Sequence, residues 1–254
     1  MTAYYNEIDP FAAQWLRELI AAGLIAPGDV DERSIEDVRP DDLVGYTQCH
    51  FFAGIGVWSH ALRRAGVADD TPVWTGSCPC QPFSSAGKRG GFDDERHLWP
   101  AFHWLIQQCA PPVVLGEQSE RAAEWLGLVR GDLEALGYAF GAIPFEAASA
   151  GAFHRRGRYY FVADAGQQGL AERESEPRIL RPMAGEPQGQ DIADAAGAGM
   201  AWFNGPDGKR RPIEPGVLPV ADGAPARVEQ IRGYGNALDA RQAAAFVQAV
   251  MEVA

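Results

Sequence analysis

The sequence predicts an α/β fold in which helices cover a largely parallel sheet. In the first two-thirds of the 254 residues, short apolar runs alternate with longer stretches whose apolar residues recur at helical spacing. The composition, 46% hydrophobic and 22% charged, is typical of a globular chain of one domain or one domain with a smaller lobe. Because no run approaches the ~20 apolar residues of a membrane span and the first ten residues are polar, we expect a cytoplasmic protein without a membrane partner.

The elements can be assigned in order along the chain. Asp9 and Pro10 form an N-cap and first-turn pair that opens the first helix, which ends before Gly23. Asp239 can cap the last helix, whose buried face is predicted to hold Phe246, Val247, Val250 and Met251. Three more helices are predicted over residues 58–66, 98–109 and 125–136. Buried strands are predicted over residues 49–53, 72–75, 113–116, 138–145 and 158–163.

A change of composition divides the chain into three parts. From about residue 165 to 225, Gly, Pro, Gln, Glu and Arg dominate, and so few large apolar residues cannot build much core. We therefore expect a main domain over residues 1–164, a small lobe, long loops or a partly disordered segment over 165–226, and a return to the main domain over 227–254. The net charge of −12 opposes binding to nucleic acid, but basic clusters at residues 155–158 and 209–211 can meet phosphate locally.

One cysteine has a distinctive setting. Cys80 lies between Pro79 and Gln81, after a predicted strand and before a Ser/Gly-rich stretch that includes Ser84 and Ser85. The four cysteines are too few and too irregularly placed for a disulfide framework, so we expect reduced thiols. Cys80 can also be a buried structural thiol or half of a clip with Cys78, but no second Cys/His pair has zinc-like spacing, and we predict no metal.

This segment resembles the nucleophile loop of the DNA (cytosine-5)-methyltransferases. The resemblance implies that Cys80 attacks C6 of a cytosine, and that Gln81, Ser84 and Ser85 belong to the substrate-binding loop.

A strand, a Gly-rich turn and a helix follow one another over residues 49–66. The turn resembles the family's donor loop, which binds S-adenosylmethionine (SAM), although His50 and Val57 depart from the usual Asp and Gly. The resemblance implies that small residues let the backbone approach the methionine moiety and that the aromatic side chain packs on adenine. The matching residues are Phe52, Ala53, Gly54, Ile55 and Gly56.

The order of the motifs is unusual. Only eleven residues separate Gly66 from Cys78, too few for the family's second and third motifs. The N-terminal stretches YNEIDPFAAQWLRELI and DVDERSIEDV resemble those motifs instead, which implies a circularly permuted, phage-like short form with a Rossmann-like methyltransferase sheet.

The permutation assigns donor contacts near the N-terminus. Glu7 would take the ribose hydroxyls and Ile8 would lie against adenine, with Ser34 or the neighbouring Asp31 accepting from the adenine amino group. The alternative for Glu7 is a helix-leading acid that favours the helix dipole.

Glu117 follows the apolar run PPVVLG, in the place of the family's ENV motif, with Gln118 and Ser119 replacing the usual Asn and Val. A cytosine ring is a poor acceptor for a thiolate unless N3 is protonated or hydrogen-bonded, and a buried carboxyl with a raised pKa can serve as that donor. The alternative is a surface acid at a strand end.

His154, Arg156 and Arg158 match the family pattern Q-x-R-x-R, with His in place of Gln. Alternate residues of an extended segment share a face, so one arginine can hold the base O2 while the other bonds phosphate or the nucleophile loop. The alternative is a solvated, Arg-rich strand.

Four further donor contacts are implied by position. Leu98, in a motif with Asp94, Arg96 and Trp99, serves either the donor or the docking of the loop. Asn236 precedes the last helix in a Gly-Asn pair, which matches the family's closing motif but is also an ordinary helix entry. The remaining two residues are Pro79 and Ala237.

The resemblance as a whole implies a SAM-dependent DNA cytosine C5-methyltransferase that acts on a flipped-out base through a covalent Cys–C6 intermediate. DNA is the expected partner, residues 165–226 the expected target-recognition region, and a monomer the expected state. An RNA cytosine C5-methyltransferase and a catalytically silent DNA-binding homologue remain alternatives.

Overall fold

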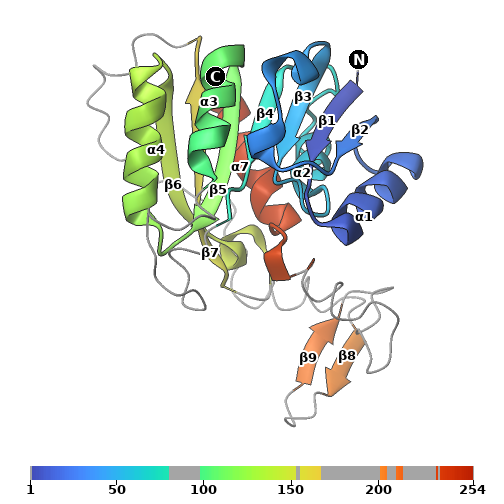
Figure 1. Cartoon of the computed structure of the whole chain (residues 1–254). Helices are drawn as coiled ribbons and strands as arrows, with labels where there is room; N and C mark the ends of the chain where they lie inside the picture. Colours follow the sequence, from blue (N-terminus) through green and yellow to red (C-terminus); the bar gives the residue numbers. More distant parts are fainter. Residues whose placement is uncertain are drawn as a thin grey trace. The chain divides into compact units, whose positions relative to one another are not determined.

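The structure is a computed structural model that describes residues 2–79, 98–152, 155–166, 201–204, 210–213, 233 and 235–253. A seven-stranded sheet with the order β2-β1-β3-β4-β5-β7-β6 forms its centre (Figure 1). The strands β2, β1, β3, β4 and β5 run parallel, whereas β7 runs antiparallel to both β5 and β6. The strands are β1 (Thr2–Asn6), β2 (Gly28–Asp31), β3 (Tyr46–Phe51), β4 (Val73–Gly76), β5 (Val113–Ser119), β6 (Ala139–Glu146) and β7 (Gly157–Asp164).

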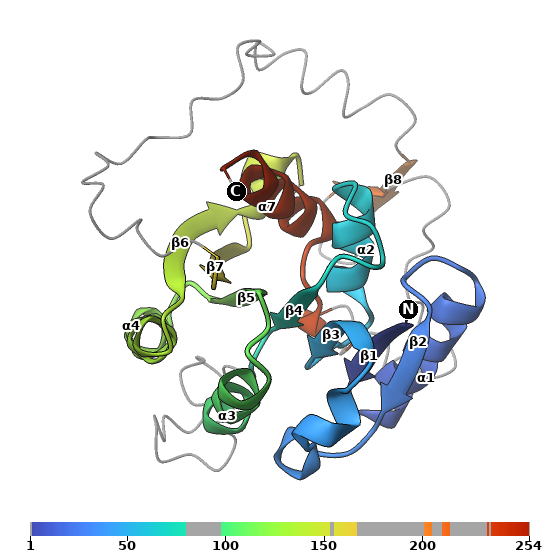
Figure 2. The same ribbon diagram turned by 90° about the horizontal axis from the view of Figure 1, so that it is seen from above.

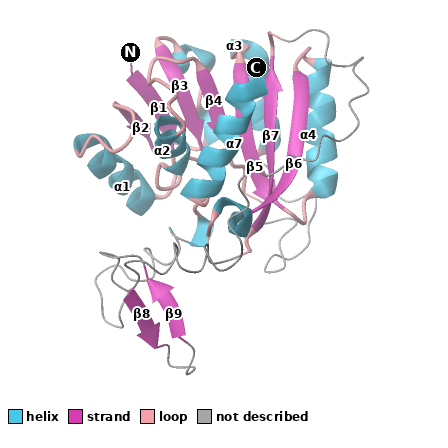
Figure 3. Cartoon of the chain, turned by 180° about the vertical axis from the view of Figure 1, so that it is seen from behind, coloured by secondary structure: helices cyan, strands magenta, loops and turns pink. Residues whose placement is uncertain are grey.

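Helices cover both faces of this sheet (Figures 2 and 3). One face carries α1 (Pro10–Ala21), α2 (Val57–Arg64) and α7 (Ala240–Val253). The other face carries α3 (Trp99–Cys109), α4 (Ala123–Ala135) and the short 3-10 helices η1 (Ile35–Asp37) and η2 (Pro40–Leu43). A third 3-10 helix, η5 (Ala147–Ala150), follows β6. The predicted α/β class is confirmed.

The first strand of the chain lies inside the sheet rather than at its edge. β1 pairs with β3, so that Tyr5 lies opposite His50 and Asn6 opposite Phe51. The residue after β1, Glu7, is therefore carried to the turn that follows β3, forty-odd residues further along the chain. Parallel pairing of β1 with β3 is what a motif order with the second motif ahead of the first requires.

Most predicted elements agree with the observed ones within a few residues, and four details differ. β2, with the sequence GDVD, was not predicted as a strand because polar residues leave it no hydrophobic period. β5 continues to Ser119, so Glu117 lies within a strand and not after one. β6 is an edge strand with a largely exposed or half-buried pattern, not a buried strand. Met251 is 51% exposed, so its predicted burial is wrong.

The chain forms two compact units, Met1–Ala171 with Arg232–Ala254, and Glu172–Ile231. In the second unit the structure describes two antiparallel strands, β8 (Ala201–Asn204) and β9 (Arg210–Ile213). Among the described residues, none of the helices has the length and apolar character needed to cross a membrane.

Candidate active site

Among the described residues, those predicted to carry chemistry lie at the end of the sheet where its parallel strands finish, the lower end in Figure 1. β1, β3 and β4 end there, β5 reaches it with Glu117, and the antiparallel β7 begins there. The carboxyl edge of an open parallel sheet is the usual place for a binding site, because loops from neighbouring strands meet at it.

The turn after β3 has the tight backbone that its sequence indicates. Phe52, Gly54 and Gly56 all have left-handed φ angles, of 53°, 54° and 77°. Around Gly54 no described residue lies within 4 Å of the position that a Cβ would take. At Gly56 a Cβ would lie 3.0 Å from Leu16 Cδ2 of α1, so a side chain there would require that leucine to shift. The left-handed φ angles favour glycine at both positions.

Glu7 lies directly against this turn. The Gly54 amide donates to Glu7 Oε2 at 2.7 Å, and the Asp9 amide donates to Oε1 at 2.9 Å. Burial raises the pKa of Glu7, and these two hydrogen bonds lower it by less than burial raises it. Each carboxylate oxygen keeps a lone pair for a further donor, such as a ribose hydroxyl.

The neighbouring surface also fits a nucleoside. Ile8 is 64% exposed and follows the half-buried Glu7. Phe52 is partly buried and packs edge-on against Phe102 of α3, with ring centroids 6.1 Å apart. A carboxylate, an exposed aliphatic side chain and a Gly-rich turn are suitable for the ribose, the adenine and the methionine moiety of SAM.

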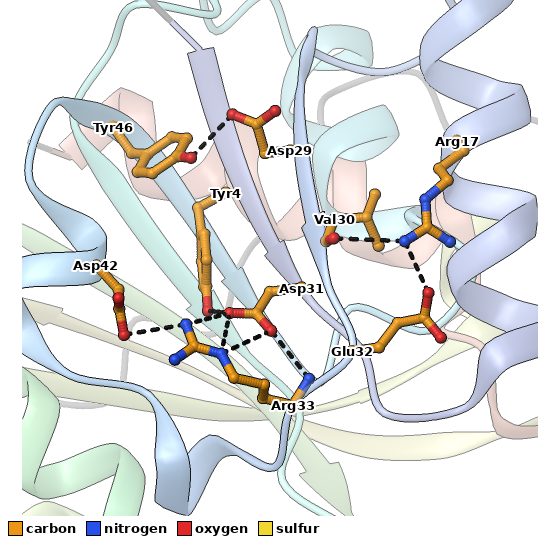
Figure 4. A pocket seen from close by; sticks show the side chains of 9 residues that line it. All are labelled: Tyr4, Arg17, Asp29, Val30, Asp31, Glu32, Arg33, Asp42 and Tyr46. Atoms are coloured by element: carbon orange, nitrogen blue, oxygen red, sulfur yellow. Dashed lines mark hydrogen bonds and ion pairs between the residues drawn. The ribbon is translucent and has the colours of Figure 1, made fainter.

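Of the two candidates for the adenine amino group, Asp31 is the poorer one (Figure 4). It lies in a cleft of about 400 Å³ beside β2, where Arg33 Nε and Nη2 and Tyr4 Oη all donate to its carboxylate, at 2.7 to 3.1 Å. Its acceptor capacity is thus already used. Ser34 is the better candidate, because its hydroxyl oxygen accepts only a long 3.4 Å hydrogen bond from the Glu36 amide, which caps η1, and can accept another donor.

Glu117 forms the chemical centre at the other side of the edge. Its Oε1 lies 2.7 Å from Arg158 Nε, and the side chains of Glu117 and Arg158 are only 12% and 23% exposed. Burial raises the pKa of Glu117, and the charges of Arg158 and Arg156 and a hydrogen bond from Ser77 lower it only in part. The result is a carboxyl group that holds its proton to a higher pH than an ordinary glutamate, as a proton donor must.

Ser77 is a member of this site that the sequence did not single out. Trp58 of α2 donates from Nε1 to Ser77 Oγ at 3.0 Å, and Ser77 in turn hydrogen-bonds Glu117. A hydroxyl that accepts from an indole is left with its own proton to donate, so it orients one oxygen of the carboxylate. The available signal was only its place two residues before Pro79, at the end of β4.

The two predicted arginines have different hydrogen-bond partners, although the charges of both act on Glu117. Arg156 precedes β7 and has a left-handed φ of 31°, where the alternation of a strand does not apply. Its Nη2 donates to the carbonyl of Ala237 and, at 3.2 Å, to that of Gly235. Arg158 alone pairs with Glu117 among the described ion pairs.

The residues just before α7 (233 and 235–237), called the closing segment below, contact the turn after β3. A Cβ on Gly233 would lie 3.5 Å from Ile55 Cγ2, and the Ala237 amide donates to the Gly233 carbonyl at 3.0 Å. Asn236, between the two carbonyls that Arg156 binds, is exposed. The segment thus spans the distance between the turn after β3 and the start of β7.

The described residues on either side of residues 80–97 are fixed to the core. The Cys78 carbonyl accepts from Gln118 Nε2 at 3.2 Å, and Trp99 Nε1 donates to Asp132 of α4 at 2.7 Å. Pro79 is exposed and Leu98 packs partly buried on the core. Burial raises the pKa of Cys78 well above that of an ordinary thiol, so it is unsuited to act as a nucleophile.

Several predicted residues lie outside the part of the chain that the structure describes, and their placement stays a prediction. They are Cys80, Gln81, Ser84, Ser85, Asp94, Arg96, His154 and Lys209.

Comparison with known proteins places this geometry in context. The model of the C-5 cytosine-specific DNA methylase family matches residues 62–194, a range that includes Cys80, Glu117 and Arg158 but not Glu7 or the turn after β3. No curated protein matches the chain.

Three solved structures are similar to parts of the chain. DNMT2 of Spodoptera frugiperda is 15% identical with a TM-score of 0.44, over 68% of this chain and 45% of that one. Dnmt2 of S. pombe is 16% identical with a TM-score of 0.39, over 70% and 57%. A putative DNA modification methyltransferase encoded within an E. coli prophage is 16% identical with a TM-score of 0.40, over 65% and 47%. The chain thus spans about half the length of the structures it matches.

Proposed function

The chain belongs to the C-5 cytosine-specific DNA methylase family, and from this premise we propose that it transfers a methyl group from SAM to C5 of a cytosine in DNA. The observation that carries the proposal is the buried Glu117 carboxyl, with a raised pKa and an arginine at 2.7 Å, at the edge where the donor turn also lies. Such a group is what cytosine chemistry at C5 requires and what a surface acid cannot supply.

Glu117 supplies the proton or the strong hydrogen bond that the target base needs at N3. Protonation or strong hydrogen bonding at N3 draws electron density from C6 and makes that carbon electrophilic. Ser77 and Arg158 bind the carboxyl group from two sides, which fixes its direction before a base arrives. Arg158 also donates from Nη1 to the Gly157 carbonyl at 2.8 Å, so its own position is held by the start of β7.

Cys80 is the proposed nucleophile. Its sulfur, as the thiolate, would add to C6 while Glu117 protonates or hydrogen-bonds N3. The electron pair that reaches C5 would then form the bond to the methyl group as the bond from that group to the SAM sulfur breaks, and S-adenosylhomocysteine would leave. Loss of the C5 proton, to water or a base not yet named, then expels the thiolate by β-elimination. Because C6 is inaccessible inside a stacked duplex, the cytosine must leave the helix before this addition.

We assign the donor to the turn after β3. Glu7 would bind the ribose hydroxyls, Ile8 and Phe52 would contact adenine, and Asn236 would contact the methionine end. When bound there, SAM supplies an electrophilic methyl group. The Glu7 carboxylate accepts hydrogen bonds from the Asp9 amide, in the loop after β1, and from the Gly54 amide, in the turn after β3. Its position therefore depends on the pairing of β1 with β3.

The rest of the assignment concerns DNA. We propose that residues 165–226 read the target site and that the main domain comprises residues 1–164 and 227–254. Arg155, which is highly exposed, and the basic cluster at residues 209–211 would contact phosphate.

A covalent trapping experiment tests the proposal. The chain is incubated with SAM and a duplex containing 5-fluorocytosine, whose fluorine blocks the elimination step and leaves Cys80 bound to C6. We expect a denaturation-resistant adduct with the wild type and with Cys78→Ser, and none with Cys80→Ala. Because the target site is unknown, duplexes of mixed sequence are used, and cytosine modification is sequenced in DNA from cells that express the chain.

A matched RNA of the same sequence is the second arm. Trapping of RNA and not DNA would reassign the substrate, and absence of both, together with absence of modified cytosine in the expressing cells, would refute the activity. Equal loss of trapping in Cys78→Ser and Cys80→Ala would point to a shared structural role for the two thiols.

A further inference from the structure

We propose that Arg156 is a positioning residue that fixes the closing segment at the start of β7 and thereby couples the donor side of the site to the Glu117–Arg158 pair. The inference rests on the proposed function, and it gives Arg156 a role different from contact with the base or with phosphate.

The guanidinium of Arg156 is committed to the closing segment. Nη2 donates to the carbonyls of Gly235 and Ala237, which are 79 and 81 residues away in sequence. Its Nε is buried and has no hydrogen-bond partner among the described residues. Two carbonyls bound by one guanidinium fix both the distance and the direction of the segment, because the donors of arginine form a rigid, planar fork.

The backbone of Arg156 is held in the conformation that this contact requires. Its φ of 31° is a left-handed value that non-glycine residues seldom adopt. Gln242, fully buried on α7, binds the backbone of Arg156, because its Nε2 donates to the Arg156 carbonyl at 3.3 Å and to the Phe145 carbonyl. The side chain of Arg156 thus hydrogen-bonds the segment before α7, while Gln242 in the first turn of α7 hydrogen-bonds the backbone of Arg156.

The closing segment connects this contact to the donor turn. The Ala237 amide donates to the Gly233 carbonyl at 3.0 Å, and a Cβ on Gly233 would be in van der Waals contact with Ile55 Cγ2, at 3.5 Å. Asn236 lies in sequence between the two residues whose carbonyls Arg156 binds. Asn236 is the residue that we assign to the methionine end of the donor. SAM bound to Asn236 would therefore also fix the Gly235 and Ala237 carbonyls that accept from Arg156.

The other end of the connection is Glu117. The positive charge of Arg156 lowers the pKa of Glu117, second only to that of Arg158 among the charged neighbours. A shift in the position of the Arg156 guanidinium therefore changes the electrostatic field at the Glu117 carboxyl group, which activates the base. Since coupling between two sites is reciprocal, a bound base that holds Glu117 and the two arginines in place favours the donor-side segment in return.

Binding of SAM to the free protein, measured by calorimetry, tests the inference. Arg156→Gln removes the charged fork and should weaken SAM binding about tenfold, as expected for hydrogen bonds from a charged group to a fixed carbonyl. Arg156→Lys should recover part of the loss, because an ammonium group can reach one carbonyl but cannot bind two in one plane. Arg241→Gln is the matched control, because Arg241, in the first turn of α7, also donates to a distant backbone carbonyl, that of Gly151 at 3.0 Å.

A double-mutant cycle separates positioning from direct contact. If Arg156 acts through the closing segment, Arg156→Gln combined with Asn236→Ala should lose much less affinity than the two separate losses together, because both remove the same contact. Additive losses would mean that Arg156 does not act through Asn236. Steady-state kinetics should show that Arg156→Gln raises the KM for SAM by a larger factor than it lowers kcat.

Hydrogen exchange of the free chain provides a readout that does not need SAM. Arg156→Gln should speed exchange of the Ala237 amide and of the amides at the start of α7, and Arg241→Gln should leave the Ala237 amide unchanged. If the wild type binds SAM and Arg156→Gln binds it equally well with unchanged exchange, the inference is wrong and the proposed function stands. If the wild type binds no SAM, the proposed function fails, and accelerated exchange in Arg156→Gln still decides whether the segment is held by Arg156.

Discussion

Replacement of Arg158 by Met gives a sharp test of the buried carboxyl, because it concerns stability and needs no substrate. Met keeps much of the aliphatic volume of arginine and removes its charge and donors. Glu117 then keeps its hydrogen bond with Ser77 and the more distant charge of Arg156 but loses the group 2.7 Å from its Oε1. A carboxylate buried without its partner is strongly unfavourable, so Glu117 will take up a proton in the folded variant.

The proton uptake sets an upper limit to the penalty. In the unfolded chain the Glu117 carboxyl titrates near its ordinary pKa of 4.5. Binding a proton at pH 7 requires about 1.4 kcal/mol for each pH unit above that value, or about 3.4 kcal/mol in total. The charge of Arg156 compensates part of the lost interaction, so the measured loss of unfolding free energy should lie below this limit, after the smaller loss from packing is allowed for.

The pH dependence has a definite sign. Burial already raises the folded pKa of Glu117 above the unfolded one in the wild type, and loss of Arg158 raises it further, so the additional stability lost at pH 7 is recovered as the pH falls towards 4.5. At pH 5 the limit shrinks to about 0.7 kcal/mol, since only half a pH unit remains to be overcome. Urea unfolding of wild type and Arg158→Met between pH 5 and pH 8 measures the difference.

A second replacement isolates the charge. Arg158→Met combined with Glu117→Gln carries no buried carboxylate, so it should be more stable than Arg158→Met alone at pH 7 and should show no such dependence on pH. Arg130→Met is the matched control, since Arg130 pairs with Glu134 at 2.8 Å on the exposed surface of α4 and should change stability by less than about 1 kcal/mol at every pH. A loss in Arg158→Met that is the same at pH 5 and pH 8 would refute the description of Glu117 as a buried, arginine-paired acid.

Three further predictions concern separate parts of the site. Cys80→Ser should abolish methyl transfer in a tritium-release assay while Cys78→Ser keeps at least part of it, and equal losses would contradict the assignment of the nucleophile. Glu7→Ala should weaken SAM binding by about 1–3 kcal/mol in calorimetry, as for loss of hydrogen bonds to a charged group, and unchanged affinity would remove Glu7 from the donor site. Trp99→Phe should lower the free energy of unfolding by about 1–3 kcal/mol, because the hydrogen bond to Asp132 at 2.7 Å is lost. If the double variant with Asp132→Asn loses as much stability as the two single variants added together, the hydrogen bond contributes nothing.

Local patterns were sufficient wherever one element carries its own signal. Asp9 and Pro10 open α1 as predicted, because the Asp9 side chain accepts from the amides of Phe11 and Ala12 and Pro10 takes the first helical position. The Gly-rich turn could be predicted because left-handed φ angles at Gly54 and Gly56 leave glycine as the residue of choice. β2 could not, because four mostly polar residues become a strand only through pairing with β1.

The proximity of Glu7 and the donor turn was predictable for a different reason. No local signal joins residue 7 to residue 54, but the missing motifs after Gly66 required the N-terminal strand to pair next to β3. The observed bond from Gly54 to Glu7 at 2.7 Å agrees with that deduction, whereas the use of Glu7 by a ribose stays a proposal.

The partner of Arg156 shows where such reasoning ends. The spacing Arg-x-Arg predicts a shared face only if both residues are extended, and the φ of 31° at Arg156 breaks that condition. The chain's route after β7 then decides which group the guanidinium meets, and the closing segment returns only 79 residues later. The pKa of Glu117 has the same origin, because Ser77, Arg156 and Arg158 come from β4's end, the residue before β7 and β7 itself. A carboxyl group tuned by three separate segments has no signature in any single stretch of sequence, so its chemistry can be established only when the segments are seen together.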